Sequence, residues 1–256
     1  MTALVTLLGH RIGYSASPAM LNAAFAAAGI DARYELRDVP AEELGSAVEE
    51  LRSAGTLGAN VTQPHKVEVL DLVDEVGPEV DRIGALNTIV RRGDRLVGRN
   101  TDMTAIVARL AVLAPEPWQV VVLGAGGASR AVVIALTDAG AQGVNLVTRF
   151  DWHRIGELLV RADLLVNATP IGTASDESPI PAEMLRPDLR VLDLVYRPSP
   201  TRLVREALAA GASAEGGAGV LLAQAAASFE LWTGIAAPLE VMRSALEAEL
   251  GAAADG

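Results

Sequence analysis

The alternation of apolar and polar residues in the middle of the chain predicts a strand, a tight turn and a helix. Residues 120–122 form a β-branched run, which is typical of a strand buried on both faces of a sheet. Small residues follow at 124–127, and apolar residues then recur at helical spacing over 131–138. A second apolar run at 144–147 comes one helix later, so the pattern predicts a β-α-β unit.

The turn of this unit has the composition of a dinucleotide-binding loop. Gly124 and Gly126 match the first two glycines of G-x-G-x-x-G/A, whereas the third position holds Ser129. Such a turn lets the backbone approach a pyrophosphate, and the N–H groups that begin the next helix point toward it. A glycine-rich turn alone is weak evidence, but the β-α-β spacing favours a nucleotide site.

The beginning of the chain alternates strand and helix patterns. Strands are predicted at 3–9 and 32–37, and helices at 18–28 and 40–53. Ser17 is expected to cap the first helix and Pro18 to open it. Ser15 and Ser17 also follow the carboxyl end of the first strand, where two hydroxyls are suited to bind a carboxylate.

A third strand pattern ends in a polar turn, and a helix is predicted to begin near Pro64. This arrangement gathers Asn60, Thr62 and Lys66 at one strand-to-helix junction, where α/β folds keep their ligand groups. For Asn60 and Thr62 the alternative role is hydrogen bonding within the turn.

Residues 84–102 predict a β-hairpin around a Gly-Asp turn. Asn87 opens the hairpin, and Thr101 and Asp102 close it, so antiparallel pairing is expected to bring these polar residues together. Asp102 also precedes an apolar helix at 106–113, and its alternative role is that of helix cap.

The strand at 144–147 ends in a tip that is expected to face the ribose of the nucleotide. An arginine there suits a 2′-phosphate and an acid suits a free 2′-hydroxyl, and this chain has both Arg149 and Asp151. The choice between NADP and NAD therefore stays open, and Asp151 has helix capping as an alternative role.

Further elements are predicted as a linker at 115–117, strands at 162–172 and 190–195, and helices at 201–210, 220–233 and 237–250.

Composition narrows the class of protein. The chain has 256 residues and a net charge of −11, which argues against nucleic acid or an anionic membrane surface as a partner. It has no cysteine, so disulfides and thiolate chemistry are excluded, and a cytoplasmic location is predicted. We expect no metal, because the three histidines at 10, 65 and 153 lack metal-site spacing. No apolar run approaches the roughly 18 residues of a membrane span, and the first residues are typical of a strand rather than a signal peptide.

Lys66 stands out among the basic residues. Of the 21 lysines and arginines, 20 are arginine, and Lys66 is the one lysine. Arginine does not give up a proton at working pH, whereas lysine can when its surroundings shift its pKa. Together with its polar neighbours, this makes Lys66 the candidate for proton transfer.

The chain resembles the shikimate dehydrogenases and their quinate/shikimate relatives. The resemblance is carried, in order along nearly the whole chain, by G-Y-S-A-S-P, G-A-N-V-T-Q-P-H-K, G-A-L-N-T, G-R-N-T-D, L-G-A-G-G-A-S-R-A, N-A-T-P-I-G, D-L-V-Y-R-P and G-V-L-L-A-Q. It implies an α/β fold with two domains: a substrate domain at 1–102, to which helices at 219–256 return, and a Rossmann-like NAD(P) domain at 103–218. It implies the reversible NADP- or NAD-linked reduction of 3-dehydroshikimate to shikimate, in the pathway to chorismate and the aromatic amino acids.

The resemblance also assigns roles to residues. Lys66 and Asp102 would form the catalytic pair. The residues that would bind the small-molecule substrate are Ser15, Ser17, Thr62, Asn87, Thr101, Tyr196 and Gln224. Those that would bind the cofactor are Gly124, Gly126, Gly127, Ala128, Thr148, Arg149, Asp151, Thr169 and Gly219. The protein is expected to be a monomer or a homodimer.

Three departures from the family pattern keep alternatives open. Tyr14 stands where the family usually has histidine, which points to quinate or aminoshikimate as a substrate. The acid at Asp151 is a feature that resembles the NAD-accepting quinate/shikimate branch of the family. Only 13 residues separate Arg149 from Asp163, so the parallel sheet is predicted to be one strand shorter than usual. The trimmed domain leaves a non-catalytic nucleotide- or metabolite-binding paralogue as the third alternative.

Overall fold

Two β-sheets organise the chain, each in a unit of its own. The structure is a computed structural model, and it describes residues 2–113, 118–173 and 175–252. The first unit is Met1–Thr104 with Leu222–Glu249, and the second is Ala105–Leu221 with Leu250–Gly256. The predicted linker at 115–117 lies outside the described residues. None of the helices within them is both long and apolar enough to cross a bilayer.

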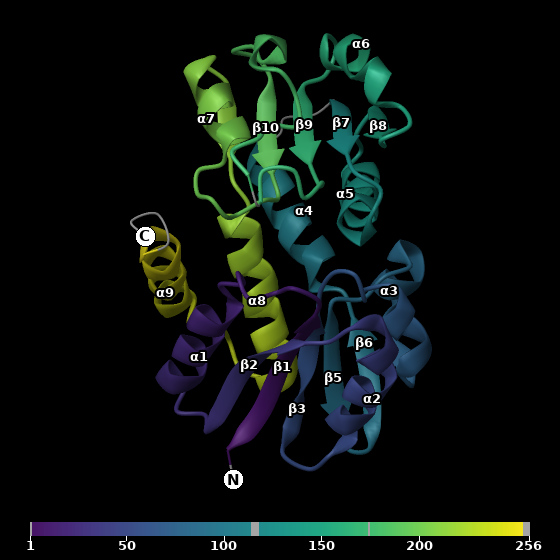
Figure 1. Ribbon diagram of the computed structural model, residues 1–256, viewed down its shortest axis with the longest axis vertical. Helices are drawn as coiled ribbons and strands as arrows, with labels where there is room; N and C mark the ends of the chain where they lie inside the picture. The colour runs from purple at the N-terminus through teal and green to yellow at the C-terminus, as the bar shows by residue number, and fades with distance from the viewer. Residues whose placement is uncertain (1, 114–117, 174, 253–256) are drawn as a thin grey trace. The chain divides into compact units, whose positions relative to one another are not determined.

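The sheet of the first unit is mixed. Its strands are β1 (Ala3–Gly9), β2 (Ala32–Asp38), β3 (Thr56–Val61), β4 (Glu75–Val76), β5 (Thr88–Arg92) and β6 (Arg95–Arg99). Their order is β2-β1-β3-β5-β6-β4, and they lie side by side in Figure 1 as far as they are labelled there. β1 is parallel to β2 and β3, whereas β5 and β6 form the predicted antiparallel hairpin. Strand β4 was not predicted from the sequence, because two residues are too few to show the alternation of apolar and polar positions that is typical of a strand.

Helices cover both faces of this sheet. The helices of the unit are α1 (Ser17–Ala27), η1 (Ala41–Glu43), α2 (Leu44–Glu49), η2 (Glu50–Arg52), η3 (Glu68–Leu72), α3 (Pro78–Ile83), the later part of α8 (Ala218–Thr233) and α9 (Leu239–Ala252), and not all of them touch the sheet. Leu44 of α2 and Val80 of α3 share a buried core with Leu8 of β1. Helices α1 and α8 meet through Phe25 and Phe229, whose ring centroids are 5.4 Å apart. Such double coverage explains the nearly continuous apolar run of β1.

Two predicted helix starts in the first unit are wrong. Ala16, not Ser17, occupies the N-cap position of α1, and Ser15 Oγ accepts a hydrogen bond from the Ser17 backbone N–H at 3.3 Å. No α-helix begins near Pro64; residues 63–67 are turns, and the 3₁₀ helix η3 begins at Glu68. At the first start, the Ser15 hydroxyl binds the backbone ahead of the helix, and local bonds of this kind compete with helix formation.

The sheet of the second unit is parallel throughout. Its strands are β7 (Gln119–Leu123), β8 (Gly143–Val147), β9 (Leu164–Asn167), β10 (Arg190–Asp193) and β11 (Ser213–Glu215), in the order β11-β10-β9-β7-β8. Its helices are α5 (Gly127–Asp138), η4 (Trp152–Arg154), α6 (Ile155–Leu159), η5 (Ala182–Met184) and α7 (Arg202–Ala209), with α4 (Thr101–Leu113) and α8 shared between the units. The three-residue β11 was not predicted, and β10 ends two residues earlier than expected.

The strand order confirms the predicted short Rossmann-like sheet. A doubly wound nucleotide-binding sheet has the order 3-2-1-4-5-6. Here β8, β7, β9, β10 and β11 take the places of strands 2, 1, 4, 5 and 6, and the described residues form no strand at place 3. Between β8 and β9 the chain forms only η4 and α6, as the 13-residue spacing predicts. The order reverses between β7 and β9, so a ligand is expected at their carboxyl ends.

Candidate active site

Lys66 and Asp102 form an ion pair in the first unit. Lys66 lies in the turn after β3, and Asp102 lies in the first turn of α4. The Lys66 Nζ is 2.6 Å from Asp102 Oδ2, and the two side chains are 18% and 16% exposed. Asn100 takes the capping role instead, because its Oδ1 accepts from the Met103 N–H at 3.2 Å. The capping alternative for Asp102 is therefore wrong, and its carboxylate faces the ammonium.

Asn87 holds this pair to the hairpin. Its Nδ2 donates to Asp102 Oδ1 at 2.8 Å and to Thr101 Oγ1 at 3.0 Å, while its Oδ1 accepts from the Thr101 N–H at 2.8 Å. The Lys66 carbonyl accepts from the Leu86 N–H at 2.9 Å. The two ends of the hairpin thus come together as predicted, and both carboxylate oxygens of Asp102 are oriented.

The side chain of Asn60 is buried and makes its hydrogen bonds inside the first unit. Its Nδ2 lies 3.0 Å from Thr88 Oγ1 and 3.0 Å from Ser228 Oγ, and its Oδ1 accepts from Tyr34 OH at 2.8 Å. Thr88, Thr101 and Ser228, which we call the hydroxyl cluster, are all buried. Asn60 therefore has a structural role, but its partners lie on other strands and on α8 rather than within its own turn.

Two other predicted substrate residues of the first unit, Ser15 and Thr62, follow the carboxyl ends of neighbouring parallel strands. Ser15 follows β1 and Thr62 follows β3, and these parallel strands are paired through Leu8 and Val61. The Thr62 N–H donates to the Leu8 carbonyl at 2.9 Å. Ser17 is buried, Ser15 and Thr62 are half-buried, and Gln224 is half-buried on α8. Tyr196 belongs to the second unit, after β10.

The glycine turn after β7 fits a pyrophosphate. Gly124 has φ +127°, and a Cβ there would lie 2.8 Å from the Ala168 carbonyl oxygen, so only glycine suits the position. Gly126 is exposed at the N-cap of α5, where no described side chain caps the helix. Gly127 and Ala128 begin α5, so their backbone is placed at the positive end of the helix dipole, where an anion binds favourably. Ser129 Oγ donates to the Gly126 carbonyl at 2.8 Å, which explains how serine replaces the third small residue.

The tip after β8 presents its arginine rather than its acid. Thr148 Oγ1 donates to Asp151 Oδ2 at 2.8 Å. Arg149 is exposed, and its guanidinium lies 4.8 Å from the centre of the Phe150 ring, which is itself 75% exposed. Asp151 is at the N-cap position of η4 but makes no side-chain cap. The capping alternative for the Asp151 side chain is therefore wrong, and the exposed cation favours a phosphate.

Thr169 and Gly219 complete the predicted cofactor set. The Thr169 hydroxyl donates to Asn167 Oδ1 at 2.7 Å, which fixes the turn after β9. Gly219 lies at the start of α8, where a Cβ would meet Arg109 Nε at 3.4 Å. Both positions are half-buried.

A buried carboxylate, Asp193, ties the ends of β9 and β10 to α7. It accepts from Asn167 Nδ2 at 2.8 Å, from the Val195 N–H at 3.0 Å and from Thr201 Oγ1 at 2.7 Å. Burial raises the pKa of the Asp193 carboxyl above its ordinary value of 3.8, although these three hydrogen bonds oppose the rise.

We expect the substitution Asp193→Asn to lower the free energy of unfolding by about 1–3 kcal/mol, because the amide N–H₂ would replace one of the two accepting oxygens and would face the donor or donors bound to it, which are Asn167 and Val195 at Oδ1 and Thr201 at Oδ2. Since the folded pKa is raised, the contribution of Asp193 is complete below 3.8 and is lost as pH rises through the folded value. Urea unfolding of both proteins from about pH 4 to 7 measures the difference. A difference that widens with pH would contradict the assignment.

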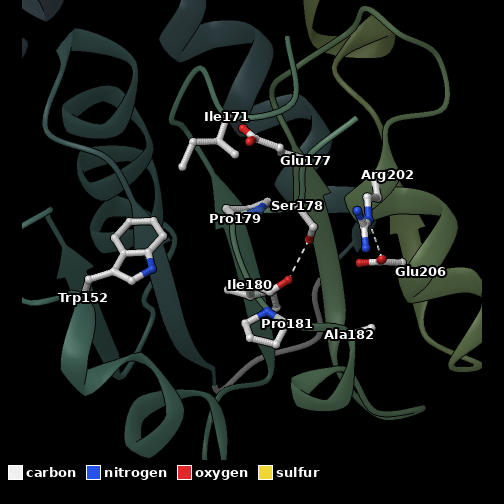
Figure 2. A pocket seen from close by; sticks show the side chains of 10 residues that line it. All are labelled: Trp152, Ile171, Glu177, Ser178, Pro179, Ile180, Pro181, Ala182, Arg202 and Glu206. Atoms are coloured by element: carbon white, nitrogen blue, oxygen red, sulfur yellow. Dashed lines mark hydrogen bonds and ion pairs between the residues drawn. The ribbon is translucent and has the colours of Figure 1, made fainter. Parts of the chain in front are cut away.

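A cavity of about 490 Å³ lies in the second unit. Figure 2 shows Trp152 on one side and Arg202 and Glu206 on the other, with Ser178 and Ile180 between them. Arg202 Nε pairs with Glu206 Oε1 at 2.6 Å. None of the ten lining residues belongs to the predicted substrate or cofactor sets, so the cavity does not mark the chemistry.

The fold and the site together define a two-unit α/β protein with a dinucleotide-binding sheet and a separate Lys–Asp site. The substrate-binding domain of shikimate dehydrogenase matches residues 7–89, and the C-terminal domain of shikimate 5′-dehydrogenase matches residues 217–247. The chain belongs to the shikimate dehydrogenase family, which confirms the resemblance seen in the sequence.

Relatives of known name match over nearly the full length. A shikimate dehydrogenase (NADP⁺) of Natronomonas pharaonis is 42% identical over 95% of this chain and 98% of its own. One of Methanopyrus kandleri is 40% identical over 96% of this chain and 95% of its own. The crystal structure of a Thermus thermophilus shikimate 5-dehydrogenase in complex with NADP(H) and shikimate has a TM-score of 0.86 and 38% identity, covering 97% of this chain and 100% of its own.

Proposed function

We propose that this protein is an NADP-dependent shikimate dehydrogenase, an oxidoreductase that reversibly reduces 3-dehydroshikimate to shikimate. The observation that carries the proposal is the Lys66–Asp102 pair, held by Asn87 beyond the carboxyl ends of β3 and β6. The named relatives, their NADP⁺ dependence and the neighbour crystallised with shikimate support it.

The residues of the first unit supply the acid–base chemistry. NADPH, when bound, supplies a hydride to the ketone carbon. The Lys66 ammonium stabilises the negative charge that develops on the ketone oxygen and gives that oxygen a proton, and in the reverse direction the Lys66 amine takes the proton back. Proton transfer of this kind contributes about 10²–10⁴-fold in rate. Asp102 aims the ammonium, and its remaining lone pairs are available to a substrate hydroxyl.

The other residues hold the two small molecules. We assign the substrate carboxylate to the hydroxyls of Ser15 and Ser17, and the ring hydroxyls to Thr62, Asn87, Thr101, Tyr196 and Gln224. We assign the binding of the pyrophosphate to the turn at 124–128 and the binding of the 2′-phosphate to Arg149. Thr148, Asp151, Thr169 and Gly219 complete the cofactor contacts. The substrate domain corresponds to residues 1–102 with 219–256, and the NADP domain to 103–218.

The initial velocity of shikimate oxidation tests the proposal, with NADP⁺ and NAD⁺ in parallel and the nicotinamide absorbance as signal. Turnover with NADP⁺ preferred supports both the reaction and the role of Arg149. A preference for quinate or aminoshikimate with NAD⁺ would favour the alternative that rests on Tyr14, whose side chain is exposed in the first loop. Absence of turnover on all three substrates would leave the non-catalytic paralogue.

Cytoplasmic location, the lack of a nucleic-acid or membrane partner and a monomeric or homodimeric state stay predictions of the sequence. Sedimentation velocity of the purified protein measures the last of these directly.

A further inference from the structure

Ser228 lies on the part of α8 that belongs to the first unit, and it is fully buried, with 0% of its surface exposed. Its Oγ is 3.0 Å from Asn60 Nδ2 and 2.9 Å from Thr88 Oγ1. The same oxygen is 3.2 Å from Thr101 Oγ1 and donates to the Gln224 carbonyl at 3.0 Å. A hydroxyl has one proton and two lone pairs, so it can make three hydrogen bonds at a time, and these four contacts fill its capacity. Ser228 thus joins α8 to segments that lie 127 to 168 positions earlier.

The hydroxyl cluster leads directly to the catalytic pair. The Thr88 hydroxyl donates to Asn87 Oδ1 at 3.1 Å, and Thr101 Oγ1 accepts from Asn87 Nδ2 at 3.0 Å. The second N–H of the Asn87 amide reaches Asp102 Oδ1 at 2.8 Å, and Asp102 Oδ2 holds Lys66 Nζ. Each link is a hydrogen bond between groups with little or no exposure to water, where competing partners are few. A series of hydrogen bonds through Thr101 and Asn87 therefore connects Ser228 with the Asp102 carboxylate.

Ser228 also determines the position of Gln224 in the first unit. The two residues are four positions apart on α8 and share a face of the helix. The cluster fixes the position of Ser228 along the helix axis relative to β3 and β5. Because Gln224 is on the same rigid helix, its position relative to these strands is fixed at the same time.

We infer that Ser228 is a positioning residue: it touches no substrate, and it sets α8 and Gln224 against Asn87 and the Lys66–Asp102 pair. This inference rests on the proposed function, since it gives the cluster a role in shikimate turnover. No pattern in the sequence singles out Ser228, except that a polar residue four positions after Gln224 interrupts an apolar helix.

The substitution Ser228→Ala tests the inference. Displacement of a catalytic group by about 1 Å can cost about 10²-fold in rate, and the remaining hydrogen bonds of Asn87 limit the shift. We therefore expect kcat for shikimate oxidation to fall by about ten-fold. The KM for NADP⁺ is expected to stay within about two-fold, because the dinucleotide residues belong to the second unit and lose no ground-state contact.

The substitution Phe229→Leu is the matched control. Phe229 is the next residue of the same helix, is equally buried and packs on Phe25 rather than on the hydroxyl cluster. It loosens α8 without removing a hydrogen bond, so we expect a lower thermal midpoint with little change in kcat. A double substitution of Ser228→Ala with Thr88→Val is expected to cost less than the sum of the single losses, because both side chains belong to the hydroxyl cluster, where their oxygens lie 2.9 Å apart.

The outcomes separate the two proposals. An inactive wild-type protein would remove the proposed function itself. An active wild-type protein with Ser228→Ala within about two-fold of its kcat would overturn the positioning role alone. Equal losses of kcat in Ser228→Ala and Phe229→Leu would also overturn it, since they would show a general effect of loosening α8.

Discussion

Replacing Lys66 with arginine is expected to lower kcat for shikimate oxidation by about 10²–10⁴-fold. The arginine keeps a positive charge opposite Asp102, so the ion pair and much of the substrate binding are expected to survive. What is lost is the group that can exchange a proton, because a guanidinium stays protonated at any working pH. Steady-state kinetics of Lys66→Arg, together with the dissociation constant for shikimate from a binding titration, measure the two effects separately.

The control for this variant is its fold. Lys66 is the sole lysine of the chain, so no second ammonium can substitute for it. A thermal midpoint close to that of the wild type, with shikimate still bound, would assign the loss to chemistry. A Lys66→Arg protein that turns over at the wild-type rate would refute Lys66 as the proton donor.

Replacing Arg149 with alanine is expected to raise the KM for NADP⁺ by about ten- to a hundred-fold, while the KM for NAD⁺ changes little. Hydrogen bonds to a charged group contribute about 1.5–3 kcal/mol, and about 1.4 kcal/mol corresponds to a tenfold change in affinity. The exposed guanidinium beside Phe150 is the group we assign to the 2′-phosphate, which NAD lacks. The ratio of kcat/KM for the two cofactors is the measurement.

Arg161→Ala is the matched control, because Arg161 is an exposed arginine of the same unit that lies outside the predicted cofactor set. It removes the same charge without touching the tip after β8. If Arg161→Ala changed the cofactor ratio as much as Arg149→Ala, the effect would be long-range charge rather than recognition. If Asp151→Asn had the larger effect, the acid rather than the arginine would read the ribose.

Much of the architecture follows from patterns of near neighbours along the chain. The run at 120–122, the glycines at 124–127 and the apolar period after them predicted β7, the turn and α5, because burial on both faces and helical periodicity are local properties. The Gly-Asp turn predicted the hairpin of β5 and β6 for the same reason. The spacing of 13 residues between Arg149 and Asp163 predicted that no strand forms between β8 and β9, because so short a segment has room only for a short helix.

The sequence by itself therefore predicted most strands of the two sheets, the glycine turn after β7 and Lys66 as the candidate for proton transfer. The tertiary structure alone decided which polar side chains are free to act. Asp102 faces Lys66 because Asn100 takes the cap, Asp151 is bound by Thr148, and Asn60 is used up by a cluster completed from α8. The bonds of Asn100 and Asp151 are local, but several polar side chains stand side by side at each of these positions, and the sequence does not say which of them makes the bond. The Asn60–Ser228 bond joins residues 168 positions apart and the Lys66–Asp102 pair joins residues 36 apart, and such partners are set by packing, on which local periodicity carries no information.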